Sequence, residues 1–228
     1  MRPAAVRGFL LGERAVVLEA PPPATLACQR RIWWLADTLR AQGEFIDIVP
    51  GMNNLTVVLD PARHDGAAVL DQLTALWQQA GSATQPQRQV DIPVHYGGEH
   101  GPDLAAVAAH CGLSEQEVIA RHSAARYTVF FLGFQPGFAY LGGLPTALAT
   151  PRRAEPRLEV PAGSVGIGGA QTGIYPATSP GGWQLIGHTT LQLFDPLREP
   201  PSLLQPGDRV RFVPQQASHA GASKNLAF

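Results

Sequence analysis

Near the N-terminus, the spacing of the hydrophobic residues changes from that of a strand to that of a helix. An apolar centre at residues 16–18 predicts a strand from Arg14 to Glu19, which the three prolines at residues 21–23 end. From Thr25 to Gln42 apolar side chains recur at helical spacing, and Gly43 is a natural C-terminal stop. The chain is therefore predicted to begin with a strand and an amphipathic helix.

Two more strands and a second helix are predicted next. Phe45–Val49 and Leu55–Leu59 read as strands joined by the turn residues Pro50–Asn54. Apolar side chains at positions 70, 73, 76 and 77 share one face of the following helix. With a further strand at Val90–Val94, this order of elements predicts a ferredoxin-like α/β sandwich.

A polar stretch, Gly81–Gln89, separates this half of the chain from the rest and reads as a linker. We therefore predict two domains, an N-terminal α/β domain over residues 1–85 and a β-rich domain over residues 86–228, for an overall α+β class. The last ~12 residues show no pattern and are expected to fray. Strands of the second domain are predicted at Tyr127–Leu132, Leu191–Phe194 and Arg209–Val213.

Two short helices are predicted early in the second domain. The first, Pro102–His110, ends at Gly112, and Ser114 with Glu117 forms a capping box that opens the next. The spacing also fits a helix-turn-helix, whose second helix must carry side chains for phosphates and base edges. Here that helix carries two glutamates and one glutamine before its only arginine. We interpret the pair as packed structural helices and expect no nucleic-acid partner.

Composition narrows the function further. The formal net charge is −1, so no global field favours nucleic acid or an acidic membrane surface. Lys224 is the only lysine, so no P-loop or Schiff-base lysine is available before the last few residues. Cys28 and Cys111 lack metal-type spacing, and we predict that they are free thiols in a reducing compartment. Glu13 and Arg14 interrupt the apolar patch near the N-terminus, and no run reaches membrane-spanning length. A cytoplasmic protein without membrane contact is expected.

The chain contains no complete catalytic or nucleotide-binding motif. GxxxxGK[ST] is absent, Gly166–Gly169 fails the GxGxxG spacing, and Ser164 does not lie in a GxSxG elbow. The seven histidines include neither HxxxH nor HxH, so a metal site would need residues from distant parts of the chain.

The most unusual stretch runs from Gly133 to His188. Between Val160 and Phe194 there is no Asp, Glu, Lys or Arg, and glycines alternate with apolar residues. Glycine among apolar residues marks tight turns or a close approach of two backbones. We therefore predict short, closely packed strands joined by tight turns.

Several blocks of this stretch resemble the allophanate hydrolase subunit 1 family. Residues 133–144, GFQPGFAYLGGL, are similar to its GFxPGFxYLGGL block, and residues 161–165, 171–176 and 179–183 are similar to its second block. Gly12–Ala15 and Pro50–Asn54 fit the N-terminal half of the family. The resemblance implies a cyclophilin-like β-barrel for the second domain.

The same resemblance implies a function. Members of the family include the B subunit of 5-oxoprolinase, which implies a subunit of an ATP-dependent 5-oxoprolinase that opens 5-oxo-L-proline to L-glutamate and is inactive alone. Its implied partner is a protein of the allophanate hydrolase subunit 2 type (the C subunit of 5-oxoprolinase), with a LamB/YcsF-type protein as a further candidate. ATP, with Mg²⁺, is expected to bind together with the partner. Two alternatives stay open: a regulatory protein that inhibits a sensor histidine kinase, and a carboxyltransferase-type component related to urea carboxylase.

Aromatic and polar residues among the glycines and prolines are the candidates for a substrate-binding or partner cleft. The aromatic rings either pack in the core or form a pocket wall or partner surface. An arginine either clamps a carboxylate bidentately or lies on the surface. No catalytic residue and no metal ligand is assigned. The candidates are Phe134, Gln135, Pro136, Gly137, Phe138, Tyr140, Arg157, Gln171, Thr172, Tyr175, Trp183 and His188.

His188 stands where the resemblance leads one to expect arginine, in a GRT sequence. A histidine holds a carboxylate or phosphate there only when protonated, and the alternative is a histidine packed into the barrel and bonded to backbone. Asp103 follows Gly101 and Pro102 and is predicted at the start of a helix, where unpaired amides stabilise a carboxylate. His95 is a second departure from the pattern of the family.

Overall fold

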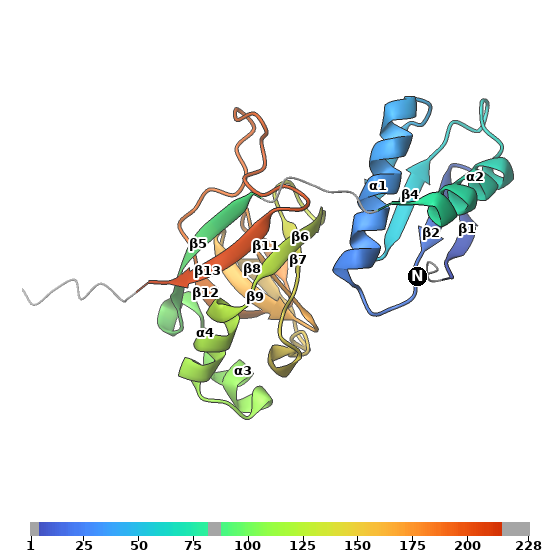
Figure 1. The fold of residues 1–228 in the computed structure, drawn as a ribbon. Helices are drawn as coiled ribbons and strands as arrows, with labels where there is room; N and C mark the ends of the chain where they lie inside the picture. The colour runs from blue at the N-terminus through green and yellow to red at the C-terminus, as the bar shows by residue number, and fades with distance from the viewer. Residues whose placement is uncertain (1–4, 82–87, 216–228) are drawn as a thin grey trace, which may run out of the picture. The chain divides into compact units, whose positions relative to one another are not determined.

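The structure is a computed structural model that describes residues 5–81 and 88–215 (Figure 1). The chain divides into two compact units. The first unit comprises residues up to 90, 126–143 and 194–210, and the second comprises 91–125, 144–193 and those from 211 onward. The predicted boundary between residues 85 and 86 and the predicted frayed C-terminal residues lie outside the described residues.

The first unit contains a four-stranded antiparallel sheet in the order β1-β2-β4-β3. Its strands are β1 (Arg7–Leu11), β2 (Ala15–Glu19), β3 (Asp47–Pro50) and β4 (Asn54–Val58). The last three match the predicted strands to within a few residues. The remaining strand of this sheet was wrongly predicted. The Val90–Val94 segment does form a strand, but it belongs to the barrel, and β1 is the fourth strand of the sheet. β1 is short and lies beside a charged turn. Its side chains are mostly exposed, so its sequence lacks the alternation of apolar and polar residues that marks a half-buried strand.

Two helices accompany this sheet, α1 (Leu26–Gln42) and α2 (Gly66–Gln79). The Thr25 hydroxyl accepts a hydrogen bond from the Cys28 amide at 3.1 Å, and Gly43 ends α1 with φ of 68°. Asp65 caps α2 by accepting from the Ala67 amide at 3.0 Å. Both predicted helices are confirmed.

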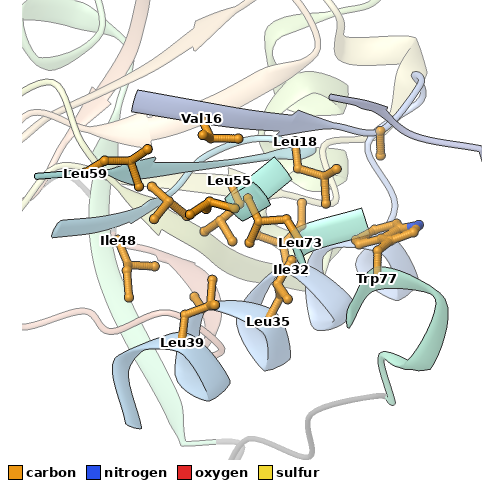
Figure 2. Close-up of a cluster of buried hydrophobic side chains, with 14 residues drawn as sticks. Val16, Leu18, Ile32, Leu35, Leu39, Ile48, Leu55, Leu59, Leu73 and Trp77 are labelled. Carbon is orange, nitrogen blue, oxygen red and sulfur yellow. The ribbon is translucent and has the colours of Figure 1, made fainter. Parts of the chain in front are cut away.

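The core of this part is a single cluster of aliphatic side chains and Trp77 between the helices and the sheet (Figure 2). Leu35 and Leu39 of α1, Leu73 of α2 and Leu55 of β4 are fully buried. Each buried aliphatic side chain contributes about 1.5–3 kcal/mol relative to an exposed one. The amphipathic spacing read from the sequence therefore reflects real burial.

Seven strands close into a barrel in the order β10-β7-β6-β13-β5-β12-β9. A two-stranded sheet, β11-β8, and the helices α3 (Leu104–Cys111) and α4 (Glu115–Ala124) accompany it, with the short 3₁₀ turns η1 (Gly98–His100) and η2 (Thr146–Leu148). The strands are β5 (Gln89–Tyr96), β6 (Tyr127–Leu132), β7 (Ala139–Gly142), β8 (Arg157–Val160), β9 (Ser164–Gly168), β10 (Gln171–Ile174), β11 (Ser179–Gly181), β12 (Gln184–His188) and β13 (Arg209–Pro214).

The predicted α+β class with a C-terminal barrel is thus confirmed. The capping box of α4 is present, and α3 and α4 pack against each other. The predicted strand at Leu191–Phe194 was wrong, because only an isolated bridge from Phe194 to Ser202 forms there. Leu193 of that stretch is buried, at 1% exposure, without joining a ladder, while Leu191 and Phe194 are half-buried. Among the described residues, no helix has both the length and the apolar character to cross a membrane.

Candidate functional site

The candidate site lies in the second unit, where the loop that carries η1 joins β5 to α3. Backbone hydrogen bonds hold this loop on β12: the Gly97 amide donates to the Ile186 carbonyl at 3.1 Å, and the Asp103 amide donates to the Leu185 carbonyl at 2.9 Å. A Cβ atom at Gly101 would overlap the Ile186 carbonyl oxygen. Glycine is therefore required for this close approach.

Three histidines from three elements meet at this loop, and we call them the histidine cluster: His95, His100 and His188. His95 of β5 and His188 of β12 are partners in the antiparallel ladder. The ring of His100, from η1, lies 5.3 Å from the ring of His95 and 5.8 Å from the ring of His188, centroid to centroid. Sequence analysis singled out His188, noted His95 and missed His100. The only signal for His100 in the sequence was the segment PVHYGGEH, which has one histidine before and one after a glycine pair.

One nitrogen of His188 is fixed by the backbone. Its Nε2 lies 2.8 Å from the Ala162 carbonyl oxygen. A carbonyl only accepts, so Nε2 carries a hydrogen and Nδ1 is the nitrogen at which the ring gains or loses its proton. Gly163, with φ of +83°, makes this approach possible, since a Cβ there would lie 2.7 Å from Nε2. His188 thus bonds to backbone, as in the second alternative, and also lines a cleft, while its binding of an anion stays a prediction.

Two clefts open on either side of His100. The first cleft, of about 440 Å³, is lined by residues that include Glu99, His100, Arg157, Glu159, Ser164 and His188. The second cleft, of about 510 Å³, is lined by residues that include His95, Tyr96, Glu99, His100 and Gln215. Volumes in this range are typical of sites for small molecules.

Asp103 organises the wall of the first cleft. Its carboxylate is 5% exposed and accepts two hydrogen bonds from Arg157, both at 2.8 Å. It accepts further bonds from Arg153 at 3.3 Å and from the Leu185 amide at 2.7 Å. Asp103 is the residue that precedes α3, as predicted, but its side chain makes no capping bond. The reason is that two guanidinium groups and a strand amide offer its oxygens stronger partners.

Arg157 therefore does clamp a carboxylate bidentately, but the carboxylate is that of Asp103. Its side chain remains 24% exposed at the cleft. The pair holds β8 to the start of α3 and keeps one positive guanidinium at the wall of the first cleft.

A buried histidine that sequence analysis missed connects strands of the second unit. His122 of α4 is fully buried, and burial lowers the pKa of its imidazole to about 3. The Thr172 hydroxyl donates to the Gly166 carbonyl at 2.9 Å, so it accepts from His122 Nε2 at 3.1 Å. The neutral ring then accepts from the Tyr96 hydroxyl at Nδ1, 2.8 Å away.

The structure places the candidate residues in two groups. In the second unit, Arg157 and His188 line the first cleft, while Thr172, Tyr175 and Trp183 are at most 5% exposed. Tyr175 and Trp183 pack edge to face at 6.4 Å. Gln171, at the start of β10, lines neither of the two clefts.

The other candidates lie in the first unit, on the turn between β6 and β7. Phe134 has φ of 67°, is 62% exposed and packs edge to face on the buried Phe138 at 5.4 Å. Tyr140 stacks on Phe131 at 4.3 Å. Pro136 is exposed, Gln135 is half-buried, and Gly137 takes the positive φ of 82° that the turn needs.

Neither a metal nor a nucleotide fits the described residues well. In residues 5–81 and 88–215, no group of three or more His, Cys, Asp or Glu side chains could hold a metal ion. The glycine run Gly166–Gly169 lies at the end of β9, not before a helix, and the only lysine, Lys224, is outside the described residues.

The structure of the urea amidolyase of K. lactis matches with a TM-score of 0.78 at 21% identity, over 92% of this chain and 15% of that one. That likeness shows the fold alone. Residues 6–204 match the family described as carboxyltransferase domain, subdomain C and D, and the chain belongs to this family.

Closer relatives confirm the resemblance to the allophanate hydrolase subunit 1 family. The B subunit of 5-oxoprolinase from Escherichia coli O157:H7 is 59% identical over 210 residues, which are 92% of this chain and 96% of that protein. The protein of the same name from Haemophilus influenzae is 50% identical over 89% of this chain and 95% of its own length. The crystal structure of TTHA0988 matches with a TM-score of 0.76 at 40% identity, over 93% of this chain but only 40% of that longer chain.

Proposed function

We propose that this chain is a subunit of a heteromeric ATP-dependent 5-oxoprolinase, which opens 5-oxo-L-proline to L-glutamate. The observation that carries the proposal is the 59% identity to the B subunit of a 5-oxoprolinase over 92% of this chain and 96% of that protein. The match covers both the small sheet and the barrel, so it extends beyond one shared domain.

The chemistry of the first cleft supports this substrate class. 5-Oxo-L-proline carries one carboxylate and one lactam group in a small ring. The cleft of about 440 Å³ offers Arg157, His100 and His188 for the carboxylate and the Ser164 side chain as a neutral polar group.

We assign ATP and Mg²⁺ to a site that is formed together with a partner protein. The described residues of this chain supply no phosphate-binding loop. We propose that the partner is of the allophanate hydrolase subunit 2 type (the C subunit of 5-oxoprolinase), with a LamB/YcsF-type protein as a further component. The match to TTHA0988 supports the presence of a partner without identifying it, because there a chain segment like this one is part of a polypeptide of more than twice its length.

Turnover by the purified proteins tests the proposal. The chain should be assayed alone and with the subunit 2 homologue from the same genome, with glutamate and ADP both measured. We expect 5-oxo-L-proline-dependent release of both products only when the proteins are combined. Robust turnover by the chain alone would contradict the proposed division of labour, and no turnover with every candidate partner present would contradict the function.

One further function has a specific observation in its favour. A 115-residue stretch is 36% identical to the urea amidolyase of Saccharomyces cerevisiae, but it spans only 6% of that protein. This supports a carboxyltransferase-type role less strongly than the full-length matches support a 5-oxoprolinase. Carboxylation of an amide substrate by the assembled complex, without ring opening, would favour this second role.

A further inference from the structure

The histidine cluster is the feature that the proposed function does not yet explain. Three imidazoles from β5, η1 and β12 lie in a row with ring centroids 5.3 and 5.8 Å apart, at the junction of two clefts. A row of imidazoles at a cleft offers a charge that depends on pH, because histidine changes its charge between pH 5 and 8.

The charged groups around the cluster come from several elements. η1 contributes Glu99, and β8 contributes Arg157 and Glu159. The carboxylate of Asp103, before α3, is shared between Arg157 and Arg153. β5 adds Tyr96, β9 adds the neutral Ser164, and Gln215 follows β13. Glu115 of α4 approaches the loop at Gly97.

The net charge at the first cleft depends on whether the histidines are protonated. Asp103 with its two arginines carries a net charge of about +1, and Glu99 and Glu159 add about −2. With neutral imidazoles the surroundings therefore repel an anion. One added proton on the cluster brings the sum to about zero and places a positive donor beside Arg157.

We propose that the histidine cluster is a proton-linked carboxylate site: a small carboxylate ligand binds at the first cleft as His188 takes up one proton from solvent. The identity of the ligand, 5-oxo-L-proline, rests on the proposed function. The site itself rests on the geometry of the cluster.

The backbone contact of His188 determines how this proton acts. Nε2–H already donates to the Ala162 carbonyl at 2.8 Å, so the incoming proton goes to Nδ1. Protonation changes Nδ1 from an acceptor, which repels a carboxylate, to a charged donor, which binds one. No covalent bond changes, and the balance is one proton gained per ligand bound.

The stacking of the rings limits the uptake to about one proton. Two positive rings with centroids 5.8 Å apart, as in the His100–His188 pair, would repel each other. A second proton on the neighbouring ring is therefore disfavoured when the first is in place.

Calorimetric titration of the full-length chain with 5-oxo-L-proline tests the site directly. Titrations in two buffers of different ionisation enthalpy give the number of protons taken up, and EDTA in all solutions removes any adventitious metal. We expect about one proton taken up near neutral pH and an affinity that falls about tenfold per pH unit in the alkaline range. 2-Pyrrolidinone, the same lactam without the carboxylate, is expected not to bind.

Variants separate the role of His188 from that of packing. His188→Arg should bind the ligand without proton uptake and with an affinity that no longer falls with pH, because arginine stays charged. His188→Gln should lose at least about tenfold in affinity, since a neutral side chain replaces a charged donor. The matched control is His110→Gln, at an exposed histidine at the end of α3, which should behave as the natural chain.

Binding without proton uptake, or equal uptake by the natural chain and His188→Arg, would overturn the proposal. So would the absence of binding both to the chain and to the complex with its partner. These outcomes are distinct from failure of the proposed function. Proton-linked binding to the chain, together with no turnover by any assembled complex, would support the site and contradict the 5-oxoprolinase function.

Discussion

At the scale of single residues, Asp103 carries more of the site than any other side chain. One carboxylate accepts from Arg157, Arg153 and the Leu185 amide, and so joins β8, β12 and the start of α3. Removing one partner of a buried ion pair leaves the other charges without compensation, which costs more than the pair contributes.

Asp103→Asn should therefore lower the free energy of unfolding by about 2 to 3 kcal/mol. This is less than for a fully buried pair, because the two guanidinium groups are 24% and 36% exposed. Chemical denaturation with a linear extrapolation measures the change.

The matched control is Asp91→Asn, which removes the carboxylate of the exposed pair between Asp91 and Arg211. Exposed pairs contribute little, so its denaturation midpoint should stay close to that of the natural chain. Equal midpoint shifts for the two variants would show that Asp103 is not the junction described above.

His122 gives the stability of the chain a predictable dependence on pH. Burial lowers the pKa of its imidazole to about 3, against about 6.5 for histidine in an unfolded chain. Between these values the unfolded state binds a proton that the folded state does not bind. Stability should therefore fall as the pH drops below about 6.5, by up to about 1.4 kcal/mol per pH unit, until the folded pKa is reached.

His122→Gln removes this titration while keeping a side chain that can both donate and accept. The free energy of unfolding of both proteins should be measured between about pH 7 and 5. We expect the natural chain to lose its advantage over the variant as the pH falls. A difference that stays constant across this range would mean that the folded and unfolded states bind this proton equally, which contradicts a lowered pKa for His122.

Sequence analysis located part of the site at this scale and missed the rest for a physical reason. His188 was identified from its place in a charge-free, glycine-rich segment and from the family resemblance, and Arg157 from its place just before that segment. His100 and His122 were missed because their neighbours come from other strands. The register that opposes His95 to His188 is a long-range property, which no local pattern contains.

At the scale of elements, the two ends of α1 have clear signals in the sequence, Thr25 at the start and Gly43 at the end. Thr25→Ala removes the hydroxyl that accepts from the Cys28 amide, and should lower the free energy of unfolding by about 1 kcal/mol. Thermal or chemical unfolding of the purified variant measures the loss.

Thr38→Ala in the same helix is its control. The Thr38 hydroxyl bonds to the Trp34 carbonyl of its own helix, so the substitution removes no cap and introduces a better helix former. It should be neutral or slightly stabilising. A loss as large as that of Thr25→Ala would indicate that side-chain packing, not capping, explains both results.

Strands were predicted less well than helices. β2, β4, β6 and β13 have apolar centres and turn residues at their ends, so they were found. β1 was missed, and the segment Leu191–Phe194 was taken for a strand because of its apolar residues, of which Leu193 is buried. Burial and ladder pairing give the same hydrophobic pattern over four residues, and only the tertiary structure separates them.

At the scale of the whole molecule, local patterns predicted a small α/β sheet followed by a strand-rich half. They did not predict barrel closure, which depends on pairing between strands far apart in the chain, such as β5 with β12. The family resemblance supplied the barrel, and the structure confirmed it. The proposed function rests on similarity over 92% of the chain and not on a local catalytic motif.

An exchange of one component tests the proposed function most directly. In a reconstituted 5-oxoprolinase of Escherichia coli O157:H7, this chain replaces the B subunit, to which it is 59% identical. We predict that the mixed complex forms glutamate from 5-oxo-L-proline with matching release of ADP, and that omitting the chain abolishes both. A mixed complex that assembles but forms no glutamate, while the complex with its native B subunit is active, would contradict the proposal.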